Sequence, residues 1–261
     1  MRLFHLVISL ILFWNCAAAA QNNVSFATLE WDPYSGENLP GYGVASAIIA
    51  EACSRVGIRP TFHFMPWKRA MEDVKTGKYD ALYSAYYSES RSKTYAVSKP
   101  YISSQLVLCA KRGTNIHWDG SIRSLAPYKI GVVLGFVNTP EFDAAHYLDK
   151  DVGPSDLLNL NKLLNDRIDL VVIDLYQALY LIKNSPALQG SLADIYFLQP
   201  PMAQKTVHVM FSKALPTWKK NLELFNKGLE SMESDGTKDY ILNKYGYLPP
   251  KLPDQQPNND N

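Results

Sequence analysis

Hydrophobic and polar positions alternate at the start of the chain, and the period then changes to that of a helix. Residues 24–31 (VSFATLEW) alternate and are rich in β-formers, which predicts a strand. Residues 44–57 carry apolar side chains at helical spacing and end in glycine, which predicts a helix. A strand at 59–67, a short helix at 68–77 and a strand at 79–87 follow. This order predicts a parallel sheet with right-handed crossovers.

A second α/β unit follows in the middle of the chain. Its expected elements are a strand at 128–135, helices at 138–148 and 154–166, a strand at 167–175 and a helix at 176–185. A further strand at 206–213 and helices at 217–236 and 237–246 complete the pattern. We therefore expect an α/β fold of two lobes, with a ligand cleft between them at the carboxyl ends of the strands.

The first twenty residues have the pattern of a secretory signal. Arg2 is followed by a short apolar run and then by four alanines, so cleavage after Ala20 is expected. The run is too short for a transmembrane helix. A lipid anchor at Cys16 stays open as an alternative, although the residues before it, FWN, are not the small ones that lipidation requires. The export signal predicts a soluble periplasmic protein.

Charge and cysteine content exclude several classes of function. The chain has 26 basic and 25 acidic residues, and Arg2 is the only formal charge in the signal, so the mature chain is neutral. Neither a nucleic-acid surface nor an acidic disordered segment is indicated. The mature chain keeps Cys53 and Cys109, each in an apolar element, which favours free packed thiols over a disulfide without excluding one. Scattered histidines predict no metal site, and no cofactor is expected.

Several segments together resemble one family. They are GYGVASAIIAEACSRVGI, GKYDALYSAYYSESRSKTYAVSKPYISSQLVLCAKRG, YKIGVVLGFVNT, NDRIDLVVIDLYQALYLI and ESDGTKDYILNKYG. In this order they are similar to the periplasmic solute-binding proteins of polar amino-acid ABC transporters (bacterial extracellular solute-binding family 3). The resemblance covers nearly the whole mature chain. It implies the type II periplasmic-binding-protein fold, in which each lobe is a mostly parallel sheet flanked by helices and two hinge crossings join the lobes.

The resemblance also implies a division of the chain. Residues 1–20 are the signal, 21–108 and 206–248 form a discontinuous lobe 1, 109–205 form lobe 2, and 249–261 form a flexible tail. The hinges are expected near LVLCAKRG (106–113) and MAQKTVHV (202–209).

Arg91 is the main candidate for ligand binding. By resemblance, Ser88 and Arg91 occupy the family's Thr-x-x-Arg positions, where the arginine pairs with the ligand's α-carboxylate. A guanidinium is planar, always charged and able to form two parallel hydrogen bonds with a carboxylate. The alternative is a solvated loop arginine that only neutralises Glu89.

The cation site is expected in lobe 2. Asp174 ends the apolar strand and corresponds by resemblance to the acid that binds the ligand's ammonium group. An N-cap of the next helix is the alternative, and both roles are compatible. Asp169, at the start of the strand, is expected to be structural.

Aromatic and polar residues are expected to complete the cleft. The resemblance places Trp31 and Tyr34 in the first strand-to-helix loop, where the family has a stacking aromatic. The other candidates are Trp67, Arg69, Tyr86, Asn138 and Thr139. Trp67 has a core position as its alternative, and Arg69 either recognises a second acidic group or covers the sheet with its stem. The segment YSAYYSES at the end of strand 79–87 is shorter and more aromatic than the family pattern, so the identity of the ligand stays open.

The expected function is capture of an amino acid or related small zwitterion for ABC-type uptake. The protein would act as a monomer with a membrane permease, without nucleic acid and without catalysis. A cleft enzyme of the cyclohexadienyl-dehydratase type and a sensor-coupled binding protein remain as alternatives.

Overall fold

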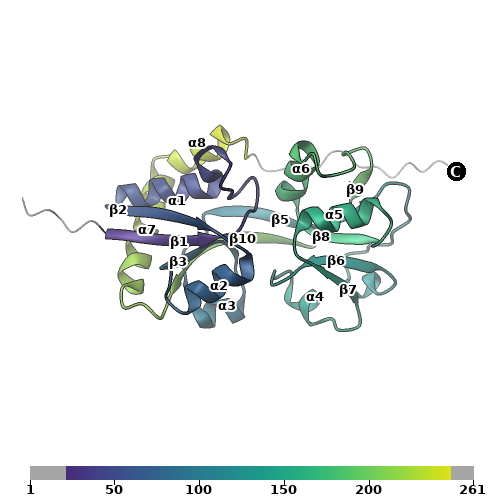
Figure 1. The fold of residues 1–261 in the computed structure, drawn as a ribbon, viewed down its shortest axis with the longest axis horizontal. Helices are drawn as coiled ribbons and strands as arrows, with labels where there is room; N and C mark the ends of the chain where they lie inside the picture. The colour runs from purple at the N-terminus through teal and green to yellow at the C-terminus, as the bar shows by residue number, and fades with distance from the viewer. Residues whose placement is uncertain (1–21, 248–261) are drawn as a thin grey trace, which may run out of the picture.

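The structure, a computed structural model, describes residues 22–247 as two α/β bodies side by side (Figure 1). The expected signal peptide, Cys16 and the tail 249–261 lie outside the described residues. The strands are β1 (Asn22–Thr28), β2 (Ile58–Phe64), β3 (Ala81–Tyr86), β4 (Tyr95–Val97), β5 (Ile102–Lys111), β6 (Lys129–Val133), β7 (Asp149–Gly153), β8 (Leu170–Asp174), β9 (Ile195–Phe197) and β10 (Ala203–Ser212). The helices are α1 (Val44–Arg55), α2 (Trp67–Lys75), α3 (Glu89–Thr94), α4 (Pro140–Ala144), α5 (Asp156–Leu164), α6 (Leu175–Asn184), α7 (Trp218–Ser234) and α8 (Thr237–Lys244), with 3₁₀ turns η1 (Pro40–Tyr42) and η2 (Ile122–Leu125).

The strand order is β2-β1-β3-β10-β5-β8-β6-β7, with β4 also paired to β10 and β9 to β5. Pairs within each body that involve β1 or β6 are parallel, whereas β3–β10, β10–β5 and β5–β8 are antiparallel. We call the body with β1–β4, α1–α3, α7 and α8 lobe 1, and the body with β6–β9 and α4–α6 lobe 2. The predicted fold of two mostly parallel lobes is confirmed.

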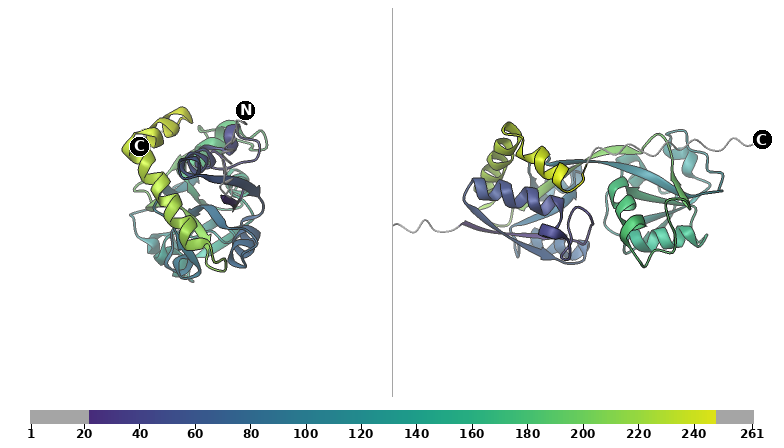
Figure 2. Two further views of the ribbon diagram at one scale, coloured as in Figure 1. Left: turned by 90° about the vertical axis from the view of Figure 1, so that its left-hand side faces the viewer. Right: turned by 90° about the horizontal axis from the view of Figure 1, so that it is seen from above.

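Two long strands connect the lobes. The first half of β5 pairs with β10, and its second half pairs with β8 of lobe 2. Strand β10 pairs with β5 through Ala203–Val207 and then continues along β3 of lobe 1. Seen from above, these strands bridge the space between the bodies (Figure 2). Strand β5 therefore joins β8 and β9 of lobe 2 to β10, and β10 joins β5 to β3 and β4 of lobe 1.

Some expected boundaries were wrong for local reasons. Strand β1 stops at Thr28 because the chain turns at Trp31, whose N–H donates to the Ser35 carbonyl at 2.7 Å. The expected helix at 138–148 is only Pro140–Ala144, and the edge strand β7 follows it. The pattern hid β7 because its sequence, DKDVG, is highly charged, as is common for an edge strand.

Both cysteines of the described residues, Cys53 and Cys109, are free and buried. Cys53 packs in the large apolar cluster under α1, and Cys109 packs in a separate cluster beneath α5 and α6. Burial raises the pKa of the Cys53 thiol to about 12, so this group is inert at neutral pH. None of the described helices is long and apolar enough to cross a membrane.

Candidate functional site

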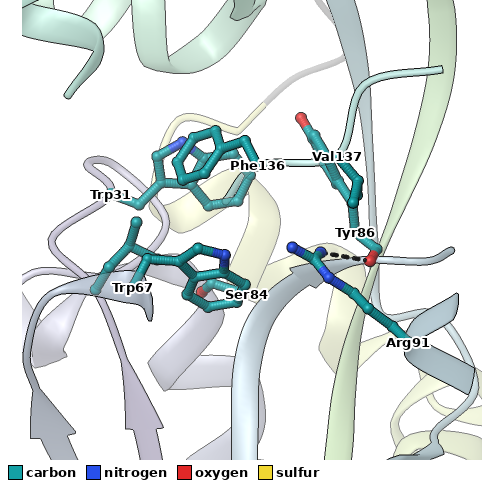
Figure 3. Close-up of a pocket in the computed structure, with 8 residues that line it drawn as sticks. Trp31, Trp67, Ser84, Tyr86, Arg91, Phe136 and Val137 are labelled. Atoms are coloured by element: carbon teal, nitrogen blue, oxygen red, sulfur yellow. Dashed lines mark hydrogen bonds between the residues drawn. The ribbon is translucent and has the colours of Figure 1, made fainter. Parts of the chain in front are cut away.

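A small pocket lies where the lobes meet, and both lobes contribute to its wall (Figure 3). Its lining residues are Leu29, Trp31, Trp67, Ser84, Tyr86 and Arg91 from lobe 1 and Phe136 and Val137 from lobe 2. The enclosed volume is about 20 Å³, room for a single water molecule. Pockets that hold small ligands are typically about 300–1,000 Å³, so the pocket in this arrangement of the lobes is too small for such a ligand.

Arg91 lies on α3, a six-residue helix that the Ser88 hydroxyl caps by accepting the Arg91 N–H at 3.2 Å. The side chain is 7% exposed, so the alternative of a solvated loop arginine does not hold. Glu89, the partner of that alternative, pairs with Lys93 at 3.1 Å. Arg91 thus turns inward from an otherwise exposed helix.

The Arg91 guanidinium bonds only to neutral acceptors within the described chain. It donates to the Tyr86 carbonyl at 2.9 Å and to the Gly135 carbonyl at 3.1 Å, and it lies 5.2 Å from the centre of the Trp67 ring. No ion pair joins it to any carboxylate in residues 22–247. Burial lowers its pKa to about 10, which still leaves it charged at neutral pH. A buried cation without a counter-ion is costly, and it is a natural receptor for an anion.

Gly135 supplies the lobe 2 acceptor for Arg91. Its carbonyl also accepts the Trp67 Nε1–H at 3.2 Å, so one oxygen receives two donors from lobe 1. The residue has φ +79°, which favours glycine, and an added Cβ would lie 3.2 Å from the Met71 Cε atom. We expected Gly135 only as the end of a strand, because its contacts to lobe 1 leave no local signal.

Two buried polar atoms of the pocket have no hydrogen-bond partner among the described residues. They are the Trp31 Nε1–H and the Ser84 hydroxyl, whose residues are 4% and 5% exposed. Ser84 also has φ +57°, a conformation rare outside glycine, while its N–H donates to the Tyr101 hydroxyl at 3.1 Å. Unpartnered groups in a pocket are where a ligand can supply the missing hydrogen bonds. Ser84 was not among the expected site residues.

Asp174 lies in a cage of hydroxyl groups that crosses the lobe boundary. Its carboxylate accepts hydrogen bonds from Tyr34 at 2.8 Å, from Tyr86 and from Ser104. Tyr34 and Tyr86 belong to lobe 1, and Ser104 belongs to the connecting strand β5. Asp174 is 4% exposed and does not line the pocket. Tyr86 connects it to the pocket, because the Tyr86 hydroxyl donates to Asp174 and the Tyr86 carbonyl accepts from Arg91.

Asp174 is also the N-cap of α6, as its alternative role required. One carboxylate oxygen accepts the N–H groups of Tyr176 at 2.9 Å and Gln177 at 3.2 Å. Burial raises the pKa of Asp174, while the hydrogen bonds from the hydroxyls of the cage and from the Gln177 N–H oppose the rise. Asp169 is structural, since it accepts the Lys129 N–H at 2.7 Å.

The aromatic candidates belong to two groups of packed rings beside the pocket. Trp31 stacks on Tyr34 with ring centres 4.1 Å apart, and it meets Tyr86 edge to face at 5.4 Å. Trp67 meets Phe136 of lobe 2 edge to face at 6.4 Å. Tyr34 is fully buried behind Trp31 and supports the wall without lining the pocket.

The remaining candidates lie around the pocket without lining it. Arg69 is largely exposed on α2, and its guanidinium lies 3.6 Å from the Asp73 carboxylate. Thr139 caps α4 by accepting the Phe142 N–H at 3.2 Å. Asn138 binds Asp143 through its backbone N–H at 3.0 Å and its side-chain amide at 2.9 Å.

Lys205 stands close to the pocket, and its strand β10 had suggested only a hinge. Its Nζ donates to the Asn138 carbonyl at 2.6 Å and lies 5.1 Å from the centre of the Tyr86 ring. Burial lowers the pKa of this lysine, with a further lowering from Arg91 and an opposing effect of Asp143.

Two α/β lobes that meet over a pocket and are linked by two long strands are the architecture of two-lobed solute-binding proteins. The chain belongs to the bacterial extracellular solute-binding proteins, family 3, whose model matches residues 26–247.

Similarity to individual proteins agrees with this family. A probable histidine-binding protein of Campylobacter jejuni is 26% identical over 207 residues, which cover 78% of this chain and 76% of that protein. A histidine kinase sensor domain similar to periplasmic binding proteins has 17% identity and a TM-score of 0.77, covering 88% of this chain and 99% of that one. The GluR0 ligand-binding core of Nostoc punctiforme, solved with L-glutamate, has 16% identity and a TM-score of 0.71, covering 86% of this chain and all of that one.

Proposed function

We propose that this protein captures an amino acid or a similar small carboxylate between its lobes and delivers it to a membrane permease of the ABC type. The observation that carries the proposal is Arg91, a buried cation at the lobe boundary whose acceptors are two backbone carbonyls and the Met71 sulfur, all uncharged. A carboxylate that replaces the Gly135 carbonyl would supply the missing counter-charge. The Trp31 and Ser84 donors are near enough to line the same space.

Binding would couple to movement of the lobes. The Gly135 contacts and the Asp174 cage join lobe 2 to lobe 1, and a ligand must open the first of these to reach Arg91. We propose that the division falls at residues 108–109 and 205–206, on the two connecting strands. Rotation there would be a hinge closure around the ligand.

The other expected site residues fit this proposal in different ways. Trp31, Trp67 and Tyr86 form the apolar wall around the ligand. Asp174 would accept the ligand's ammonium group if that group replaced a hydroxyl of the cage. Ser88, Asn138 and Thr139 would act through the positions of α3 and α4, and an export signal and periplasmic location complete the proposal.

Isothermal titration of residues 21–261 with the twenty amino acids tests the proposal. For the ligand found, Arg91→Met should weaken binding by roughly 100-fold, since removing one partner of a buried charge pair costs about 2–5 kcal/mol. Arg112→Met is the matched control, because Arg112 also donates to two backbone carbonyls, those of Ala193 and Ile195, but away from the pocket. Equal affinity of the Arg91 variant and the native protein would contradict the proposal.

A further inference from the structure

A second cation, Lys205, lies at the edge of the pocket on the side of the connecting strands. Lys205 rises from β10, the strand that connects the lobes, and its side chain is partly buried. Its ammonium donates to the carbonyl of Asn138, the residue directly after Val137 of the pocket lining. It also lies over the ring of Tyr86, which lines the pocket as well. Lys205 therefore stands at the edge of the pocket, in contact with both lobes.

Lys205 and Arg91 flank the same residue. The Tyr86 carbonyl accepts the Arg91 guanidinium at 2.9 Å, and the Tyr86 ring faces the Lys205 ammonium at 5.1 Å. The lowered pKa of Lys205, due first to burial and in part to Arg91, agrees with this closeness. Two positive groups held beside one tyrosine create a local field that favours a ligand of negative charge.

Lys205 keeps free hydrogen-bonding capacity. An ammonium group has three N–H donors, and the described residues supply one hydrogen bond, from the Asn138 carbonyl. Lys205 takes part in none of the ion pairs found in residues 22–247. Two donors can thus be offered to a ligand without breaking the contact that positions the side chain.

The acids nearby do not balance these cations inside the pocket. None of the eight lining residues is acidic. Both oxygens of Asp174 already accept hydrogen bonds from the cage and the α6 N-terminus. Asp143 acts on both cations, but it is exposed and holds Asn138. Glu30 and Asp32 belong to the first loop, where burial and Glu30 raise the pKa of Asp32 to about 6.

We propose that Lys205 sets the specificity of the pocket for ligands with two acidic groups, acidic amino acids or short dicarboxylates. Arg91 binds one carboxylate and Lys205 binds the other, across the Tyr86 ring. This inference rests on the proposed binding function and names its ligand class. A neutral or basic side chain in the same place leaves the Lys205 ammonium without a counter-charge, and a desolvated, unpaired group is a strong element of discrimination.

Glutamate and glutamine form the decisive comparison, because they match in shape and differ in charge. Residues 21–261 are titrated calorimetrically with L-glutamate, L-glutamine, L-arginine, L-histidine and succinate. Glutamate should bind at least about 30-fold more tightly than glutamine. Lys205→Met should weaken the binding of glutamate by a similar factor and change the affinity for glutamine by no more than about threefold. The ratio of the two affinities should then approach one.

Lys150→Met is the matched control. Lys150 also donates to a backbone carbonyl, that of Phe142 at 2.6 Å, and also lies over an aromatic ring, that of Phe142 at 4.8 Å. Lys150 reaches α4 from β7, and neither of its acceptors, Phe142 and Asp143, lines the pocket, whereas Lys205 lies over the lining residue Tyr86. The control should leave every affinity unchanged, and Lys205→Arg should retain the preference for glutamate. Circular dichroism of each variant confirms that it folds.

The outcomes test the inference about Lys205 separately from the proposed binding function. Tight binding of succinate together with glutamate supports the inference and assigns the ligand to dicarboxylates in general. Binding of glutamine, arginine or histidine at least as tightly as glutamate, or a ratio unaffected by Lys205→Met, overturns the inference and leaves the binding function intact. If the native protein binds none of the twenty amino acids and no dicarboxylate, the proposed function itself fails.

Discussion

Replacing Asp174 by alanine should strongly destabilise the protein, because the carboxylate is a shared acceptor at the lobe boundary. The variant leaves the hydroxyls of Tyr86 and Ser104 without their acceptor, whereas Tyr34 still contacts Ser104 at 2.8 Å. Each buried hydroxyl that loses its partner costs about 1–3 kcal/mol. Loss of the α6 cap adds about 1 kcal/mol. The expected loss is therefore about 3–7 kcal/mol, a large part of the about 5–15 kcal/mol typical of a folded protein.

Asp174→Asn should cost much less. Asparagine caps helices as well as aspartate does, and its amide can donate to the two hydroxyls once they rotate to accept. We expect about 1–2 kcal/mol, the difference between charge-assisted and neutral hydrogen bonds. The difference in unfolding free energy between the two variants measures what the hydrogen bonds of the cage contribute, separately from the charge of Asp174.

Urea unfolding, followed by both tryptophan fluorescence and circular dichroism, gives the free energies. Asp169→Ala is the control, directly before the same strand. Its exposed carboxylate accepts one backbone N–H, and a loss of about 0.5–1.5 kcal/mol is expected. If Asp174→Ala loses no more stability than Asp169→Ala, the cage does not hold the lobes and the reasoning is refuted.

Two further results follow from buried groups outside the site. Burial, with a contribution from Asp174, raises the pKa of Asp156 from 3.8 to about 8, so the folded state holds a proton that the unfolded state has released. The free energy of unfolding should therefore fall as pH rises from about 4 to about 8, by about 1.4 kcal/mol per pH unit from this group. Asp156→Asn should remove that slope when both proteins are unfolded with urea at several pH values. Parallel pH dependences of the two proteins would contradict the prediction. Gly228→Ala should destabilise by about 1–3 kcal/mol, because the added Cβ would overlap the Ala52 backbone carbonyl where α7 packs on α1. Helix propensity alone predicts that Gly228→Ala gains about 1 kcal/mol of stability, and the exposed control Lys227→Ala should show a smaller gain of this kind. A lower melting temperature of Gly228→Ala supports the overlap, and a higher one contradicts it.

Much of the fold followed from local pattern. Period-2 and period-3.6 spacing identified β1, α1, β3, α5, β8 and α6 near their true positions. The shortest elements escaped, since β4 and β9 have three residues each and depend on β10 and β5 for their pairing. The match of Ser88 and Arg91 to the family's Thr-x-x-Arg positions marked Arg91 without showing that its side chain is buried.

The site was predictable only in part, for a related reason. Trp31, Trp67, Tyr86 and Arg91 lie at or after the carboxyl ends of β1, β2 and β3, and all four line the pocket. That they bind a ligand stays a prediction. Ser84 was missed because its role depends on a rare backbone conformation.

The sequence by itself determined the alternation of strands and helices, the family and the identity of the inward-facing arginine, since each depends on residues close together in the chain. Only the tertiary structure decided what those residues meet. The Gly135 carbonyl lies 44 positions from Arg91, Asp174 lies 140 positions from Tyr34, and Lys205 lies 67 positions from Asn138. Contacts over such separations depend on how the two connecting strands set one lobe against the other. No local pattern records that arrangement, because it results from the packing of the whole chain.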